Sequence, residues 1–278
     1  MSFLQLKQVS KSYGARSVLD GVSLSVEEGE FVSIVGTSAA GKTTLLSIAA
    51  GLRQPDRGTV TLGGTPMAGF SRTAAFVFQN YSLLPWFSAL ENVRLAVGSV
   101  FPDLTRQRQT IQALRYLEMV GLLKAAEKKP RELSGGMRQR VALARAFAVE
   151  PRILFLDEPF GALDALTRAT LQQELAQLCA CTGRTVTSIM ITNSVDEAIL
   201  LSDRILALSR GPGAALGPAV PVSLARPRNA HGLMHDQDAV RIRAGLIEFL
   251  ASSAARPVHP GGRAPAPKVS ETPAEVEA

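Results

Sequence analysis

The sequence predicts an α/β fold with a large apolar core, and three observations carry that prediction. The chain has 278 residues, of which 46% are hydrophobic, enough for one compact domain with an appended lobe. Short apolar strands alternate with segments of helical period. The run Phe31–Val35 is apolar almost without interruption, which indicates a strand buried on both faces.

The remaining elements follow from period and turn residues. Ile111, Leu114 and Leu117 recur at helical spacing, within a region from about 88 to 150 that changes character towards helix. Gly51 ends a helix, and Gly63 and Gly64 mark a hairpin turn. We expect strands at 4–9, 18–26, 31–35, 58–62, 153–156 and 186–191, and helices at 42–50, 138–149, 165–181 and 241–250.

Composition excludes several classes of protein. No run approaches the roughly 18 apolar residues of a membrane span, and the first ten residues lack the apolar core of a signal peptide. Two cysteines exclude a disulfide scaffold and fit a reducing cytosol. Cys179 and Cys181 do not share a helix face, so we expect no metal site there. The net charge of +6 suits an anionic partner without choosing among nucleotide, nucleic acid and lipid.

The domain is expected to end near residue 250. Residues 251–278 contain five prolines, seven alanines and three charges of each sign, without apolar period. Such a segment cannot bury enough surface to offset its ordering entropy. We predict a domain over 1–250 and a disordered Pro/Ala-rich tail to which no function is assigned.

The segment Gly36–Thr43 fits the phosphate-loop pattern of glycine, four residues, then Gly-Lys-Thr. It lies between a buried strand and a helix, so its backbone N–H groups and the helix N-terminus can wrap a phosphate. Lys42 is expected to reach the β- and γ-oxygens, and the Thr43 hydroxyl to bind magnesium. The predicted phosphate-binding residues are Gly36, Thr37, Ser38, Ala39, Ala40, Gly41, Lys42, Thr43 and Thr44.

Two acids follow the apolar strand 153–156. Asp157 is expected beside the phosphate loop, where it can hold magnesium through water. Glu158 would point towards the γ-phosphate and polarise the attacking water as a general base. Without the phosphate loop, a buried strand followed by two surface acids would explain these residues equally well.

A second anion site is expected at Ser134, Gly135 and Gly136, which precede a helix. Ser134 is an N-cap, and the glycines expose N–H groups at the positive helix end. If both sites lie on rigid elements that face outward, this turn cannot serve the same phosphate as Lys42. A head-to-tail pair of subunits would resolve this, because each chain would supply one half of two composite sites. Taken alone, the five residues Leu133–Met137 read better as an ordinary capped helix.

The order of these motifs, with Gln79 between them, resembles the ATP-binding subunit of an ABC transporter over residues 3 to 250. The resemblance implies a P-loop NTPase fold of ABC type: a RecA-like core, an antiparallel β subdomain and a helical signature subdomain at about 88–150. It implies ATP and Mg²⁺ as cofactors. Tyr13 matches the aromatic residue that stacks on adenine, and Asp164 the loop that couples the two sites. Without the resemblance, Tyr13 would be a strand-edge aromatic and Gln79 a surface amide.

The resemblance assigns the other site residues and the partners. Gln79 matches the glutamine that touches magnesium and relays to the membrane subunit, and Ser134–Gly136 match the signature that closes over the partner's γ-phosphate. A second ATPase subunit, identical or different, and transmembrane permease subunits are implied, with a periplasmic solute-binding protein acting indirectly and no nucleic acid. The implied place is peripheral, on the cytoplasmic face of a bacterial inner membrane.

Three segments resemble importers of nitrate, taurine and alkanesulfonates. These are Leu83–Trp86, Asp157–Arg168 and Val195–Ala198. Ser202–Arg204, with Ala225–Arg228 and the helix 241–250, favours the nitrate, nitrite and cyanate branch, with taurine or alkanesulfonate as the alternative solute. None of these residues is expected to touch the solute.

The sequence departs from the family pattern at Asn193, where a histidine normally contacts the γ-phosphate. Asparagine donates a neutral hydrogen bond and cannot pass a proton. Two hypotheses stay open: hydrolysis at this site is weak, with a complete partner subunit alongside, or Glu158 suffices. Thr37 and Ala39 replace a common proline and glycine where the phosphate-loop pattern accepts any residue.

Three other classes of protein share some of these motifs. An ABC ATPase acting on ribosomes or DNA usually needs two cassettes or a long coiled coil, and this chain has one phosphate loop and no heptad run. A small-molecule kinase has no use for the turn at Ser134. A nonhydrolytic ATP-binding regulator is the strongest alternative because of Asn193.

Overall fold

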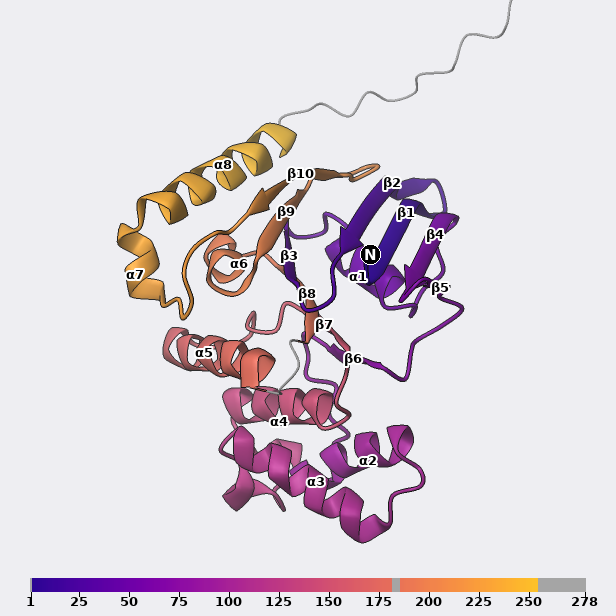
Figure 1. Cartoon of the computed structure of the whole chain (residues 1–278), viewed down its shortest axis with the longest axis vertical. Coiled ribbons are helices and arrows are strands. Elements are labelled where there is room, and N and C mark those ends of the chain that lie inside the picture. Colours follow the sequence, from indigo (N-terminus) through magenta and orange to yellow (C-terminus); the bar gives the residue numbers. More distant parts are fainter. Residues whose placement is uncertain (1, 182–185, 255–278) are drawn as a thin grey trace, which may run out of the picture.

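The computed structural model describes residues 2–181 and 186–254, which form two β-sheets and a helical lobe (Figure 1). The larger sheet has six strands and the smaller has four. The six strands, in spatial order, are β10 (Leu216–Pro221), β9 (Arg204–Leu208), β3 (Phe31–Val35), β8 (Thr187–Thr192), β7 (Ile153–Asp157) and β6 (Ala74–Val77). All neighbours pair in parallel except β10 with β9.

The smaller sheet is antiparallel and lies beside the larger one at the right of Figure 1. Its order is β2 (Arg16–Val26), β1 (Leu4–Tyr13), β4 (Arg57–Leu62) and β5 (Thr65–Pro66). Helix α1 (Lys42–Ala49) packs between the two sheets, because Leu45 and Ile48 share one apolar cluster with Leu6 of β1 and Ile34 of β3.

Strand β3 separates two apolar cores. Phe31 and Val35 belong to one cluster, while Val32 and Ile34 belong to the other. All five residues of the strand are buried. This confirms the prediction of a strand covered on both faces, and it places the loop that follows β3 at the edge of a fully packed sheet.

The helical lobe lies at the bottom of Figure 1. Its helices are α2 (Ala89–Val100), α3 (Arg106–Met119) and α4 (Gly135–Phe147), with short 3₁₀ turns η1 (Leu123–Ala125) and η2 (Pro130–Glu132). A capping box of Ser88 and Glu91 begins α2. Ser134 caps α4 as predicted, and the glycines of the turn are the helix's first residues rather than a loop before residue 138.

Four helices complete the core: α5 (Ala165–Cys181), α6 (Val195–Leu201), α7 (Ala230–His235) and α8 (Gln237–Ala254). Helix α8 is longer than the predicted 241–250, so residues 251–254, which we assigned to the tail, are helical. The rest of the tail, 255–278, lies outside the described residues. The prediction also missed the short strands β6, β9 and β10. No helix in the described part of the chain is both long and apolar enough to cross a bilayer.

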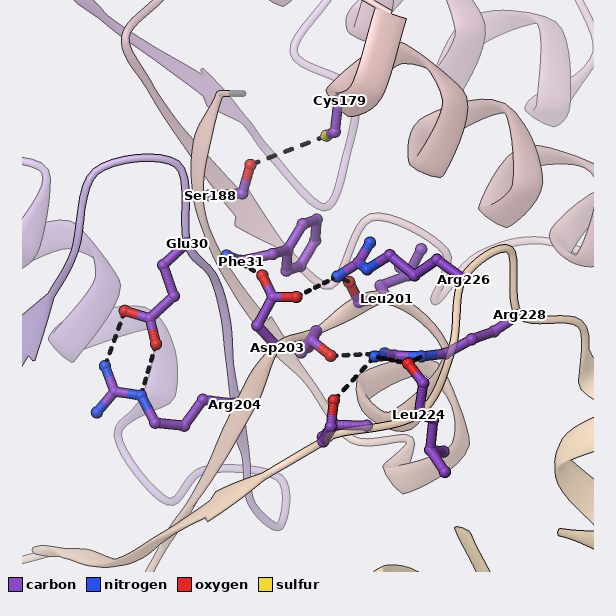
Figure 2. Close-up of polar contacts among 12 residues, drawn as sticks. Glu30, Phe31, Cys179, Ser188, Leu201, Asp203, Arg204, Leu224, Arg226 and Arg228 are labelled. Atoms are coloured by element: carbon purple, nitrogen blue, oxygen red, sulfur yellow. Dashed lines mark hydrogen bonds and ion pairs between the residues drawn. The ribbon is translucent and has the colours of Figure 1, made fainter. Parts of the chain in front are cut away.

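Two arginines fasten the segment between β10 and α7 to the core (Figure 2). Arg228 donates to the carbonyls of Ile199 and Ser202 at the end of α6, at 2.9 and 2.6 Å, and to those of Val222 and Leu224. Arg226 binds Asp203 at 2.7 Å. The Ala225–Arg228 motif therefore stabilises the attachment of the last two helices.

We expect Arg228→Ala to destabilise the chain. The carbonyls at the end of α6 would lose a charged donor. Each buried acceptor left unsatisfied would lower the free energy of unfolding by about 1–3 kcal/mol. Arg241→Ala is the matched control, because Arg241 pairs with Asp238 on an exposed face of α8, where ion pairs contribute at most about 1 kcal/mol. Thermal unfolding of both variants checks this. An equal melting temperature for the two variants would contradict the stabilising role of Arg228.

Candidate functional site

The candidate site lies where three parallel strands end at one edge of the larger sheet. Strands β3, β8 and β7 are neighbours, and their carboxyl ends are followed by Gly36, Asn193 and Glu158 respectively. Ligands of open α/β sheets bind outside the carboxyl ends of the strands. The sheet topology thus brings the predicted phosphate loop, the predicted base Glu158 and Asn193 together at one place.

Lys42 is the centre of this cluster. Its side chain is only 4% exposed. Its Nζ donates to the carbonyls of Gly36 and Thr37, at 3.0 and 3.1 Å, and to Oδ1 of Asn193 at 2.6 Å. It also lies 3.3 Å from Oε1 of Glu158. Burial lowers the pKa of Lys42, and Glu158 opposes that shift.

The loop before α1 depends on one glycine in particular. Gly41 has φ of 99°, and a Cβ at this position would lie 2.8 Å from Val18 Cγ1. A larger residue would be strained and would push the β2 strand away. Ala39 also has a positive φ, 62°, which explains why glycine is usual at that position.

Asp157 and Thr43 are hydrogen-bonded to each other beside the Lys42 cluster. The Thr43 hydroxyl donates to Oδ1 of Asp157 at 3.2 Å. Asp157 is 6% exposed, and burial raises its pKa while the Thr43 hydrogen bond opposes this. Hydroxyl and carboxylate oxygens are hard ligands of the kind that Mg²⁺ prefers. The donor set therefore fits magnesium.

Glu158 has three protein partners. Its Oε1 accepts from Asn193 Nδ2 at 2.8 Å and faces Lys42, and its Oε2 accepts from Gln79 Nε2 at 3.3 Å. Its φ of 43° is rare for a glutamate, and such strain clusters at functional sites. The sequence could not predict this backbone conformation. Gln79 turns its amide nitrogen towards Glu158, and no group in the described part of the chain hydrogen-bonds to its amide oxygen.

An open cleft of about 520 Å³ joins these groups to the antiparallel sheet. Tyr13 lines it, 43% exposed, and Arg53 donates to the tyrosine hydroxyl at 3.1 Å. An aromatic ring held at the mouth of a phosphate cleft can stack on a base. Sequence analysis missed Arg16 and Val18, which also line the cleft. The cleft is lined by Tyr13, Arg16, Val18, Ser38, Ala39, Gly41, Lys42, Thr43, Thr44, Gln79, Glu158 and Asn193.

The structure does not bring the second predicted anion site into this cleft. Ser134 Oγ accepts from the Met137 N–H at 3.3 Å, at the start of α4 in the helical lobe. A Cβ on Gly136 would lie 2.5 Å from Thr167 Cγ2, so the turn packs against α5. Asp164 accepts from the Thr167 N–H at 3.0 Å. A separate group outside the cleft lining is thus formed by Ser134, Gly135, Gly136 and Asp164.

Comparison with known proteins identifies the family. A family model described as "ABC transporter" matches residues 19–161, just over half of the chain. The nitrate import ATP-binding protein NrtD of Synechococcus elongatus is 42% identical over 252 residues, which cover 89% of this chain and 91% of NrtD. The chain belongs to the ABC transporter family.

Two further comparisons bear on this cassette. The bicarbonate transport ATP-binding protein CmpC of Synechococcus elongatus is 43% identical over 253 residues, which cover 89% of this chain and only 38% of CmpC. The solved ATP-binding cassette MJ0796, in a dimeric post-hydrolysis state bound to ADP and Pi, is 32% identical with a TM-score of 0.71, covering 80% of this chain and all of that one. The expected ABC-type α/β fold is confirmed.

Cys179 plays no part in the site. Cys179 is buried against Ser188, and burial raises the pKa of its thiol to about 12 (Figure 2). A thiol in this state is unreactive. The side chain of Cys181 lies outside the described residues. Within the described residues, no cluster of three histidines, cysteines or acids is placed to hold a metal.

Proposed function

We propose that this cassette binds and hydrolyses ATP and thereby drives a membrane importer for a small oxyanion. One observation supports the proposal most strongly: the buried Lys42 lines one open cleft with Glu158, Gln79 and Thr43, and Thr43 is hydrogen-bonded to Asp157. The family relationship and the names of the nitrate and bicarbonate relatives support the importer class.

ATP binding follows from the chemistry of the loop. The triphosphate would replace the protein partners of Lys42, which now donates to two carbonyls and Asn193. The N–H groups at the start of α1 would hold the phosphate oxygens, since a helix N-terminus favours negative charge. Tyr13 would stack on the adenine.

Magnesium would be held by Thr43, by Asp157 through water, and by the amide oxygen of Gln79. When bound, Mg²⁺ neutralises charge that develops on the phosphates. Glu158 would accept the proton of the attacking water, since its carboxylate lies within reach of Lys42, where the γ-phosphate would bind. The water oxygen forms the new bond to phosphorus, and the bond to the β–γ bridging oxygen breaks, leaving ADP and phosphate.

The dimer would be head-to-tail. Ser134–Gly136 would close over the nucleotide in the partner's cleft, because they do not line the cleft of their own chain. ATP would thus join two subunits, and hydrolysis would release them. The partner is a second copy or a different ATPase subunit.

The permease would dock on the helical lobe. A cavity of about 380 Å³ there is lined by Phe87, Glu91, Arg94, Leu95, Gly98, Ser99 and Gln109. Nearby, Trp86 is 62% exposed, on the loop that leads from Gln79 to α2. Asn92 holds this loop through the N–H and carbonyl of Leu84. A docked permease segment would therefore act on Gln79 through this loop. The cassette would sit on the cytoplasmic face of the membrane.

The transport proposal is tested by magnesium-dependent phosphate release, with and without the membrane partners, together with uptake of labelled solute. We expect release that the complete importer stimulates, and uptake of nitrate or bicarbonate. Uptake of taurine or an alkanesulfonate instead would overturn the oxyanion assignment. Uptake of none of these solutes by an assembled importer would overturn the importer assignment.

A second candidate function is a weakly or nonhydrolytic ATP-binding regulatory subunit. Asn193 favours it, because its neutral amide bridges Lys42 and Glu158 at the position where the family has a histidine. In that case a complete ATPase subunit would complement this one in a heterodimer.

We expect Asn193→His to raise hydrolysis about tenfold. A charged hydrogen bond contributes about 1.5–3 kcal/mol against roughly 1 kcal/mol for a neutral one, and 1.4 kcal/mol in the transition state is about tenfold in rate. Single-turnover hydrolysis of the two proteins at saturating Mg-ATP measures the difference. Equal rates would mean that Glu158 suffices and would remove the argument for a regulatory subunit.

A further inference from the structure

The segment Val195–Ala198, which the site described above does not use, contains a buried acid. Glu197 lies in the first turn of α6, four residues after Asn193, and is 6% exposed. Buried carboxylates are retained only with hydrogen-bond or charged partners. The side-chain partners of Glu197 come from two different elements, β8 and α5.

One carboxylate oxygen fixes the turn that carries Asn193. Oε2 of Glu197 accepts from the Thr192 hydroxyl at 2.6 Å, and the same hydroxyl accepts from the Ser194 N–H at 3.0 Å. The Ser194 hydroxyl in turn accepts from the Glu197 N–H at 3.3 Å. The residues before and after Asn193 are therefore both held, and Asn193 is left with little freedom to reorient.

The other oxygen faces α5. Oε1 of Glu197 accepts from Gln172 Nε2 at 3.3 Å and lies 3.9 Å from Arg168 Nε. Within the described residues, Nε of Arg168 is buried and has no hydrogen-bond partner. Nη2 of the same arginine donates to the Leu163 carbonyl at 3.0 Å. Glu197 thus connects the Asn193 turn with the first turns of α5.

The first turn of α5 also contacts the elements expected to face the second subunit. Thr167 packs against Gly136, and its N–H binds Asp164. A continuous set of contacts therefore runs from Asn193, through Thr192 and Glu197, to α5. From the first turn of α5 it reaches the Asp164 loop and the Ser134 turn, which are expected to belong to the other composite site. Such contacts transmit small displacements because packed elements deform little.

We propose that Glu197 is a positioning residue for hydrolysis: it holds Asn193 against Lys42 and Glu158 and ties that turn to the first turns of α5. The inference rests on the proposed ATPase function. Glu197 itself lies outside the cleft lining, so its loss should leave ATP affinity unchanged and lower kcat.

The test compares four variants of the full chain by single-turnover hydrolysis and by ATP binding. We expect Glu197→Gln to lower kcat by about tenfold to a hundredfold, the range that small misplacements cost, with the Kd for ATP within about twofold. Thr192→Val should behave alike, whereas Thr192→Ser, which keeps the hydroxyl, should retain kcat. Glu174→Gln is the control, because Glu174 on α5 pairs with Arg140 at 2.7 Å and touches none of these groups.

A double-mutant cycle separates positioning from general destabilisation. If Glu197 acts through Asn193, Glu197→Gln should change kcat little in an Asn193→Ala background. An undiminished loss in that background would overturn the inference, as would wild-type kcat in Glu197→Gln or equal losses in Thr192→Val and Thr192→Ser. Absence of hydrolysis by the unmodified chain in every assembly would instead overturn the proposed function on which the inference rests.

Discussion

Glu158→Gln is expected to lower single-turnover hydrolysis by about 10²–10⁴-fold, the contribution of a positioned general base. The glutamine keeps the size of the side chain and can still accept from Asn193 Nδ2 or Gln79 Nε2. It cannot accept the proton of water. ATP binding should persist or tighten, because a negative charge beside the γ-phosphate is removed.

The control for this variant is Glu28→Gln, an exposed acid paired with Arg152. It should hydrolyse ATP like the unmodified chain. A Glu158→Gln protein that keeps more than about a tenth of the rate would contradict the role of base, given the size of that contribution.

Lys42→Ala is expected to weaken ATP binding by roughly 10–150-fold, since hydrogen bonds to charged groups contribute about 1.5–3 kcal/mol. Lys42 is buried in the cleft, and the phosphate loop contains no other lysine or arginine that could replace it. Its loss also leaves Glu158 without the cation 3.3 Å away, which adds repulsion towards phosphate.

Binding of ATP, measured by calorimetry, checks this prediction. Arg152→Ala is the matched control, because it removes a cation from an exposed ion pair away from the cleft. We expect its Kd to stay within about twofold, as exposed ion pairs contribute little. Affinity that is unchanged in Lys42→Ala would mean that phosphate binds elsewhere.

The sequence predicted the site best where functional residues come directly after a buried strand. The apolar strands β3, β7 and β8 predicted the sheet, and the residues directly after them predicted the candidate site. The cleft brings together residues as distant as Lys42 and Asn193, which only the parallel order of those strands places side by side.

The sequence was less informative where contacts decide the structure. Strand β6 has only four residues, too few for a period, and it forms because β7 offers a free edge. Helix α8 extends four residues beyond Leu250, where the sequence turns to small side chains. Glu158 adopts a left-handed backbone that no propensity assigns to glutamate, and the side-chain partners of Glu197 come from α5 and β8.

Light scattering on the Glu158→Gln protein, with and without Mg-ATP, measures most directly whether nucleotide joins Lys42 of one subunit to Ser134 of another. We expect a doubled molecular mass with ATP, for the chain alone or mixed with a companion ATPase subunit, and no doubling once Lys42→Ala is added. A mass that stays monomeric in saturating ATP under both conditions would contradict this expectation.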